Sequence, residues 1–222
     1  MNEIPLDWLE STLGHRPRDP ALFAMALTHS SHGRAHDYQR LEFLGDRVLG
    51  VTIAAWLYRL FPAEPEGKLS RRFNALVSGE TCAGIARTLG IPKHLLLGKQ
   101  ARDDGASDSD NVLGDVVEAL IGALFLEGGL DAAERFIQRV WADILETQDS
   151  APKHPKSALQ EWAAAHRCRT PVYTLVNRSG PHHAPAFTVK AEIPGRAEAS
   201  AEGSSKQEAE TAAAAKLLAM LK

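Results

Sequence analysis

The sequence predicts a two-domain protein, in which an all-α domain is followed by a small α+β domain with the element order α-β-β-β-α. Three observations predict this. Apolar residues recur at helical spacing through most of residues 1–146. The polar stretch 147–155 (TQDSAPKHP) then carries two prolines and no periodicity, as a linker does. Residues 156–222 include segments in which apolar and polar residues alternate, which is typical of half-buried strands.

The first long helix is expected at residues 41–60. Its apolar residues repeat every three or four positions, and Pro62 prevents its continuation. Residues 68–89 carry the same periodicity, in one helix or two, and Gly90 follows them. This half of the domain is therefore expected to consist of helices that pack along their apolar faces.

Residues 111–126 and 131–145 are expected to form two further helices. The first is strongly apolar and ends at a Gly-Gly pair, which is a common C-terminal signal, and Asp131 caps the second. The stretch before them, residues 99–110, is charged and shows no periodicity. We expect it to form a mobile loop.

Two helices are expected to flank a three-stranded meander in the second domain. The strands are predicted at residues 172–177, 186–193 and 197–202, because turn sequences rich in Ser, Gly and Pro separate these alternating segments. The helices are predicted at 157–166 and 205–221. With helices outside the meander, the arrangement belongs to the α+β class.

The composition excludes several classes of protein. Of 222 residues, 44% are apolar and 24% are charged, which is the mix of a globular chain and not of a disordered one. No apolar run approaches the roughly 20 residues that span a bilayer, and the acidic N-terminus lacks the features of a signal peptide. The two cysteines, Cys82 and Cys168, are too few for a disulfide framework or a four-cysteine zinc site. We therefore expect a cytoplasmic protein with no membrane association.

Charge is divided unevenly along the chain. Residues 1–150 hold 15 Lys and Arg against 22 Asp and Glu, whereas residues 151–222 hold 10 against 6. The second part is therefore basic although the whole chain has a net charge of −3. A basic domain of this kind is compatible with a polyanionic partner such as nucleic acid, but the charge alone does not establish one.

Four acidic residues occupy helix faces that should be buried. Within residues 112–126 the charged residues are Asp115 and Glu118, and their spacing of three places them on one face. Glu42 and Asp46, four residues apart, share a face of the helix at 41–60 that continues into apolar residues. Because burying an unpaired carboxylate costs several kcal/mol, something cationic must offset these charges.

Two kinds of cation fit this requirement. Nearby arginines could pair with the acids in a structural network, and the candidates are Arg40, Arg47, Arg71 and Arg72. Alternatively the acids could hold a hard divalent ion, since Mg²⁺ and Mn²⁺ prefer carboxylate oxygens, and such sites activate water for phosphodiester hydrolysis. The spacing alone leaves both explanations open.

The sequence around these acids resembles the ribonuclease III family. The resemblance covers nearly the whole first domain in the family's order. The segments that carry it are ALTHS at 26–30, RLEFLGD at 40–46, LSRR at 69–72 with LVS at 76–78, and VLGDVVEALIGA at 112–123. It implies an endoribonuclease whose metal ligands are Glu42, Asp46, Asp115 and Glu118, with Asp46 and Glu118 as catalytic residues.

The resemblance also implies cofactor, assembly and substrate. The metal would be Mg²⁺, with Mn²⁺ as a substitute, and it would activate water for hydrolysis of double-stranded RNA. The enzyme would be a homodimer through the catalytic domain, in which each subunit cuts one strand. Ribosomal RNA precursors and some messenger RNAs would be its substrates.

The second domain resembles a double-stranded-RNA-binding domain. The segments PKSALQEW at 155–162, GPHH at 180–183, GSSK at 203–206 and AE at 209–210 carry the resemblance. A shape-reading domain suits A-form RNA, whose shallow minor groove displays 2′-hydroxyl groups. The RNA contacts that the resemblance implies are Gln160, Glu161, His183, Ser205 and Lys206.

Two positions depart from the family pattern. Gln39 stands where the family usually has Glu, so any role of that Glu near the metals is in doubt here. Gln207 replaces the second lysine of the usual Ser-Lys-Lys run, so one phosphate contact is expected to be lost.

The sequence leaves one alternative function, a regulator that binds double-stranded RNA without cutting it. The intact set of four carboxylates argues against a regulator, because such a protein has no reason to bury them. His29, within the ALTHS segment, is expected to have a structural or hydrogen-bonding role.

Overall fold

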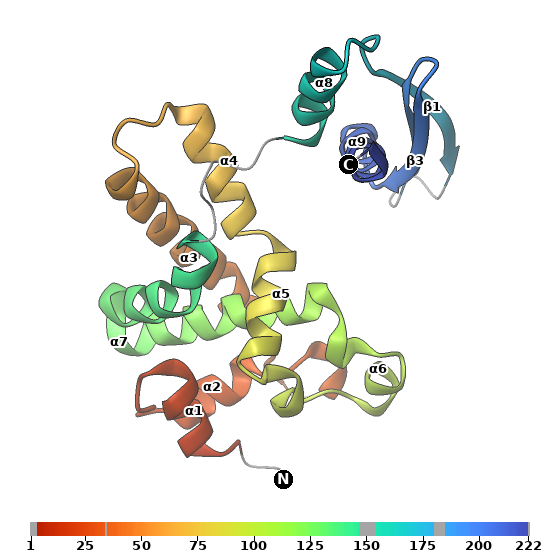
Figure 1. Cartoon of the computed structure of the whole chain (residues 1–222). Coiled ribbons are helices and arrows are strands. Elements are labelled where there is room, and N and C mark those ends of the chain that lie inside the picture. The colour runs from red at the N-terminus through yellow and green to blue at the C-terminus, as the bar shows by residue number, and fades with distance from the viewer. Residues whose placement is uncertain (1–3, 34, 147–153, 180–184, 222) are drawn as a thin grey trace. The chain divides into compact units, whose positions relative to one another are not determined.

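The structure is a computed structural model that describes residues 4–33, 35–146, 154–179 and 185–221. The chain divides into two compact units, residues 1–152 and 153–222 (Figure 1). Most of the polar stretch 147–155 lies outside the described residues. In the described part of the chain, no helix combines the length and the apolar character that crossing a membrane requires.

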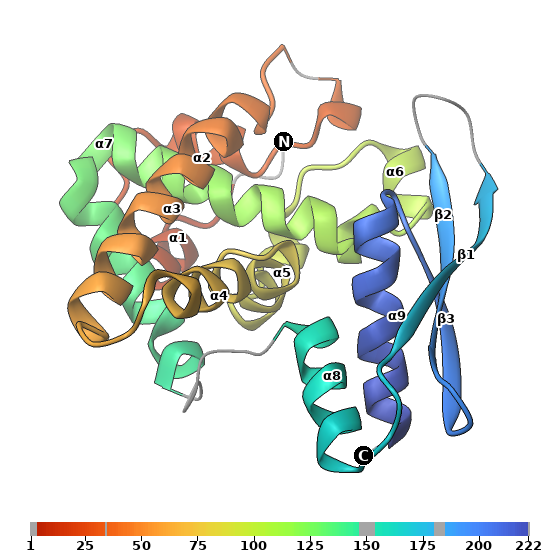
Figure 2. The same cartoon turned by 90° about the horizontal axis from the view of Figure 1, so that it is seen from above.

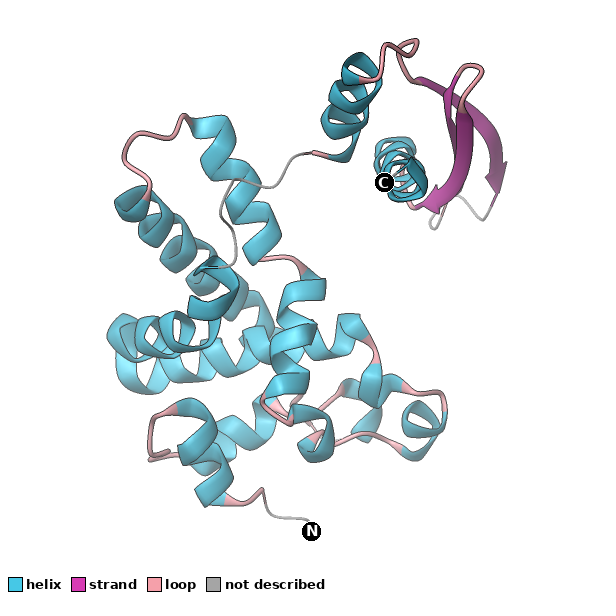
Figure 3. Ribbon diagram, in the orientation of Figure 1, coloured by secondary structure: helices cyan, strands magenta, loops and turns pink. Residues whose placement is uncertain are grey.

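The first unit is helical, as predicted. Figure 3 shows helices and loops but no strand in its described residues. Its α-helices are α1 (Leu6–Leu13), α2 (Pro20–Ala26), α3 (Gln39–Leu60), α4 (Glu66–Leu76), α5 (Gly79–Thr88), α6 (Lys99–Asp103) and α7 (Asp110–Glu146). Three short 3₁₀ segments connect them: η1 (Ser30–His32), η2 (Ile91–His94) and η3 (Ala106–Asp108).

Helices α3 and α7 form the centre of this unit. They make the most extensive helix–helix contact, and both Figure 1 and Figure 2 show α3 crossing α7. Leu49 and Ile53 of α3 and Leu120 of α7 are fully buried between them and their neighbours. Trp141 of α7 is also fully buried, and its indole N–H donates to the carbonyl oxygen of Leu76 at 2.8 Å. The predicted apolar faces are therefore the faces that pack.

Helix α7 joins two helices that the sequence predicts separately. Gly129, with φ 71° and ψ −172°, is its non-helical residue, so the chain kinks there without a connecting loop. The Glu127 carboxylate holds the kink against the segment between α1 and α2. It accepts the backbone N–H groups of Arg18 and Asp19 at 2.9 and 2.8 Å, and it lies 2.5 Å from His15 Nε2.

Residues 99–110 do not form the continuous loop that was expected. The stretch contains α6 and η3, and it is tied to α5 by Arg87. The Arg87 guanidinium donates to Asp108 Oδ1 and to Asp110 Oδ1, each at 2.7 Å. Two of the charges that suggest a solvated loop in the sequence are thus partners in ion pairs with Arg87, which a search for apolar periodicity does not detect.

The second unit has the predicted order, α8 (Pro155–Ala165), β1 (Val172–Ser179), β2 (Ala186–Ile193), β3 (Ala197–Gly203) and α9 (Lys206–Leu221). The strands form an antiparallel sheet in the order β1-β2-β3, with an irregularity in β1 between Leu175 and Asn177. Both helices pack on one side of the sheet (Figures 1 and 2). A small core of Leu159, Ala191, Ile193, Ala213, Ala214 and Leu217 joins them.

Candidate active site

The four predicted carboxylates lie on the two central helices, with Glu42 and Asp46 on α3 and Asp115 and Glu118 on α7. We call these four residues the acid cluster. All four are partly buried. The pKa of Glu118 rises to about 7, first because burial removes water from its carboxyl group and then because the other three carboxylates repel its charge. The structure therefore brings the four acids into one electrostatic group.

The other shifts in the cluster have the same main cause. Burial raises the pKa of Glu42, and the charges of Asp115 and Asp46 raise it further. Burial also raises the pKa of Asp115, against the opposing effects of a hydrogen bond from Tyr38 and of the nearby His29. The raised pKa values of Glu118, Glu42 and Asp115 mean that the loss of solvation outweighs the hydrogen bonds and positive charges that the folded chain supplies to them.

Two glycines allow the helices to approach this closely. A Cβ atom on Gly45 would lie 1.7 Å from the carbonyl oxygen of Glu118, and one on Gly122 would lie 2.3 Å from that of Leu41. Real side chains do not reach such distances, so the backbones of α3 and α7 touch at these positions. The positions of the carboxylates therefore depend on glycine at 45 and 122.

The arginine network that the sequence left open is mostly absent. Arg47 lies 2.5 Å from Asp46, but both side chains are about half exposed. Arg72 instead binds Glu64, which is outside the cluster. In the described part of the chain, neither Asp115 nor Glu118 forms an ion pair with Lys or Arg. The two most deeply placed carboxylates are therefore not neutralised by arginine.

Sequence reasoning missed Tyr38, which contacts the cluster directly. It is 5% exposed, and its hydroxyl donates to Asp115 Oδ2 at 3.1 Å. Burial raises the pKa of this phenol well above its ordinary value, and the charge of Asp115 adds to the effect. In the sequence, Tyr38 could be noticed only because it lies just before the predicted helix that carries Glu42 and Asp46. No local pattern connects it with Asp115, which lies 77 positions away.

His29 has the hydrogen-bonding role that was expected of it. Its Nδ1 accepts the backbone N–H of Ser31 at 3.1 Å, and its ring centroid lies 5.7 Å from that of Tyr38. His29 thus lies near the acid cluster but is not one of its members.

The donor chemistry of the cluster fits a hard cation. All four side chains offer oxygen, which Mg²⁺ and Mn²⁺ prefer, and the repulsion that helps to raise the pKa values of Glu118 and Glu42 would be relieved by a positive charge there. Among the described residues, no three His, Cys, Asp or Glu side chains are close enough to form a ready-made metal site. The cluster is therefore a set of suitable ligands that would have to draw together around an ion.

Cys82 lies close enough to the acid cluster to be affected by its charges, but its thiol does not take part in the chemistry of the cluster. It is fully buried, and burial raises the pKa of its thiol to about 12, with further contributions from Glu118 and Asp46. At neutral pH it therefore stays a neutral thiol, which is a poor nucleophile and a poor metal ligand.

Gln39 is exposed and lies beside an apolar hollow. With Arg40, Phe43, Leu44 and Leu126 it lines a cavity of about 810 Å³, which no member of the acid cluster lines. Phe43 and Leu126 are 64% and 57% exposed. This surrounding favours a surface role for residue 39 over direct contact with a metal.

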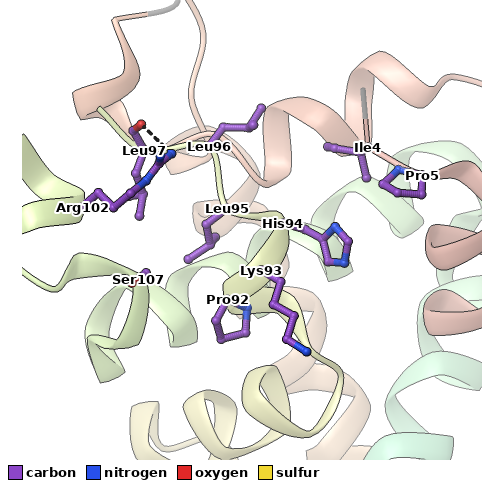
Figure 4. Close-up of a pocket in the computed structure, with 10 residues that line it drawn as sticks. All are labelled: Ile4, Pro5, Pro92, Lys93, His94, Leu95, Leu96, Leu97, Arg102 and Ser107. Carbon is purple, nitrogen blue, oxygen red and sulfur yellow. Dashed lines mark hydrogen bonds between the residues drawn. The ribbon is translucent and has the colours of Figure 1, made fainter. Parts of the chain in front are cut away.

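A second pocket, of about 470 Å³, lies apart from the acid cluster. Figure 4 shows its lining, in which Arg102 donates to the carbonyl oxygen of Leu97. The lining also includes Lys93 and His94, but no carboxylate. None of the four acids lines this pocket.

The predicted RNA contacts fall on two elements of the second unit. Gln160 and Glu161 are exposed on α8, and Ser205 and Lys206 are exposed at the start of α9. Ser205 Oγ accepts the backbone N–H of Glu208 at 3.1 Å, which caps the helix. His183 lies outside the described residues.

Comparisons with protein families match both units. A family described as Ribonuclease-III-like matches residues 19–144, and a double-stranded RNA binding motif matches residues 155–221.

Full-length relatives and a solved structure agree with these matches. A protein named Ribonuclease 3 from Zymomonas mobilis is 66% identical over 220 residues, covering 99% of this chain and 89% of that protein. A Ribonuclease 3 from Rhodopseudomonas palustris is 45% identical, covering 95% and 79%. The solved nuclease domain of a ribonuclease III from Campylobacter jejuni, described as flexible in a region involved in dimer formation, is 33% identical with a TM-score of 0.61. It covers 63% of this chain and 97% of that domain.

Proposed function

The chain belongs to the ribonuclease III family and is an endoribonuclease of double-stranded RNA, and we propose that its acid cluster is the metal-binding centre of that activity. The observation that carries the proposal is the pair Asp115 and Glu118, two carboxylates with raised pKa values and no arginine or lysine partner among the described residues. A structural cluster would be neutralised within the protein, whereas a metal centre requires an external cation.

In this proposal the metal is Mg²⁺, with Mn²⁺ as a substitute, and the four acids are its ligands. When bound, the ion supplies the positive charge that activates a water and stabilises the phosphate oxygens during hydrolysis. Glu118 must release its proton to bind, since its pKa is about 7. Asp46 must exchange its contact with Arg47 for the metal. Asp46 and Glu118 are proposed as the catalytic residues.

The two units divide the work in this proposal. Residues 1–146 cut, residues 147–155 link, and residues 156–222 bind the duplex through Gln160, Glu161, His183, Ser205 and Lys206. Exposure of the described members of this set supports the assignment, because a groove-reading side chain must reach solvent. Ribosomal RNA precursors and some messenger RNAs are the proposed substrates, which would place the enzyme in the cytoplasm.

A homodimer through the catalytic domain is also proposed. The exposed Phe43 and Leu126 beside an apolar hollow support it, because large apolar side chains gathered on a surface commonly mark an interface. The alternative of a non-cleaving RNA-binding regulator is not favoured, since the full-length relatives are named as ribonucleases.

The decisive experiment incubates the purified chain with a long, perfect RNA duplex, with and without Mg²⁺. We expect shortening that requires the ion and stops on chelation. The variant Glu118→Gln, which removes the charge of one proposed ligand, is assayed in the same way. Its matched control is Glu134→Gln, because Glu134 lies on the same helix and pairs with Arg59 at the surface. Full cleavage in the presence of chelator would contradict a metal-dependent mechanism.

A fragment tests the division of work. Residues 1–148 contain the whole acid cluster but lack the basic second unit. We expect this fragment to fold and dimerise, to lose RNA affinity at physiological salt, and to keep some cleavage at low salt with Mn²⁺. A folded fragment that is inert under those permissive conditions would contradict the proposed division.

A further inference from the structure

One neutral side chain contacts the acid cluster from a different part of the chain. The Tyr38 hydroxyl donates to Asp115 Oδ2 at 3.1 Å. Among the described residues, this is the one hydrogen bond that the Asp115 side chain makes. Within the same residues, Asp115 forms no ion pair. The orientation of this carboxylate therefore depends on a phenol and not on a charge.

Tyr38 is itself held firmly. It is 5% exposed, and its backbone N–H donates to the carbonyl oxygen of Thr28 at 3.0 Å. The segment that contains Thr28 is paired in turn with Leu96, through hydrogen bonds from His29 to Leu96 at 3.0 Å and from Leu96 to Leu27 at 2.9 Å. The phenol therefore projects from an anchored backbone, and its hydroxyl has little freedom to leave Asp115.

We propose that Tyr38 is a positioning residue, which orients the Asp115 carboxylate for the divalent cation by engaging Oδ2 and leaving Oδ1 free. A carboxylate has two oxygens, so a donor fixed on one of them restricts rotation about the Cβ–Cγ bond. Hydrogen bonds of this kind orient metal ligands in many proteins and tune their affinity. The inference rests on the proposed metal centre, and it adds a residue that lies outside the four acids.

The substitution Tyr38→Phe tests it, because it keeps the ring and removes the hydroxyl alone. Mn²⁺ binding to the RNA-free, full-length protein would be measured by calorimetry, together with thermal melting to verify folding. We expect the dissociation constant for Mn²⁺ to rise about tenfold, the lower end of the effects found for such supporting hydrogen bonds. Cleavage should suffer most at limiting Mg²⁺ and recover at high Mg²⁺, while RNA binding in Ca²⁺ stays unchanged.

Tyr173→Phe is the matched control. The Tyr173 hydroxyl is buried without a hydrogen-bond partner among the described residues and lies in the second unit, so its removal should leave the Mn²⁺ titration unchanged. An equal loss of Mn²⁺ affinity in both variants would overturn the inference, since the effect would not depend on Asp115.

A third variant separates this inference from the proposed function. If Glu118→Gln abolishes Mn²⁺ binding and Tyr38→Phe leaves it unchanged, the positioning role is wrong and the metal centre stands. If Glu118→Gln binds Mn²⁺ as tightly as the unmodified chain, the metal centre fails and the inference fails with it.

Discussion

Two regions of the first unit hold buried charge and treat it in opposite ways. Arg72 is 2% exposed, and its guanidinium donates to both carboxylate oxygens of Glu64 at 2.9 Å while lying over the ring of Phe61. This hydrogen-bonded arginine holds the pKa of Glu64 below its ordinary value. In the acid cluster, by contrast, burial raises the pKa values of both Glu118 and Asp115, and repulsion by the other three carboxylates raises that of Glu118 further.

The opposite pKa shifts of Glu64 and of the acid cluster distinguish a charge that is paired within the fold from charges that remain available for a ligand. The Arg72 guanidinium and the Glu64 carboxylate compensate each other's charge within the protein. The acid cluster carries an unbalanced negative charge that the fold tolerates only at a cost. Carboxylates with raised pKa values at the centre of a domain are therefore a signature of function, and variants of the two regions should behave differently.

The largest effect is expected from Glu118→Gln. Cleavage of duplex RNA should fall by orders of magnitude, because a ligand of the metal loses its charge, while RNA binding persists. The metal-free protein should melt at a higher temperature, since the repulsion in the cluster decreases. Turnover assays and thermal melting without metal measure both effects, and near-normal cleavage would remove Glu118 from the active site.

Gly45→Ala should also cause a large loss, but by a different route. The added Cβ would meet the carbonyl oxygen of Glu118, so α3 and α7 must separate and the acids must move. We expect lower thermal stability together with loss of cleavage. Gly84→Ala, on α5 with open space around it, is the control and should stabilise the protein by up to about 1 kcal/mol. Equal behaviour of the two variants would show that the contact between α3 and α7 is not tight.

A medium effect is expected from Arg72→Met, which keeps a flexible, unbranched side chain but removes the charged guanidinium group. Glu64 then loses its partner, so the melting temperature should fall by several degrees, while cleavage by the folded protein stays close to normal. Arg71→Met, at the exposed neighbouring position, should change neither property. A selective loss of cleavage without destabilisation would mean that Arg72 serves the reaction.

The smallest effect concerns the pH dependence of stability without metal. The pKa of Glu118 is about 7 in the folded protein and near 4.5 when unfolded, so the folded state binds the proton more tightly. Glu118 should therefore reduce stability as pH rises from about 4.5 to about 7. Glu64 has the opposite sign, because its lowered pKa contributes stability that is lost as pH falls. Comparing melting of the unmodified chain and Glu118→Gln across this range isolates the first effect, and parallel curves would contradict it.

Local patterns in the sequence were sufficient for much of the fold and for the four acids. The strand at 186–193 has the expected bounds and the helix expected at 41–60 ends where expected, although it begins two residues earlier, at Gln39. Alternation and helical periodicity reflect which face of a single segment is buried. The acids at 42, 46, 115 and 118 could be singled out for the same reason, since charge on an apolar face is visible within one helix.

The tertiary structure alone decided which distant groups meet. Tyr38 reaches Asp115, Arg72 binds Glu64 and not the cluster, and the glycines at 45 and 122 let two helices touch. Arg87 of α5 pairs with Asp108 and Asp110 at the end of the stretch 99–110. None of these contacts has a period or a fixed spacing along the chain. They depend on how separate segments cross in space, which is set by packing and not by the local conformational preferences that a sequence displays.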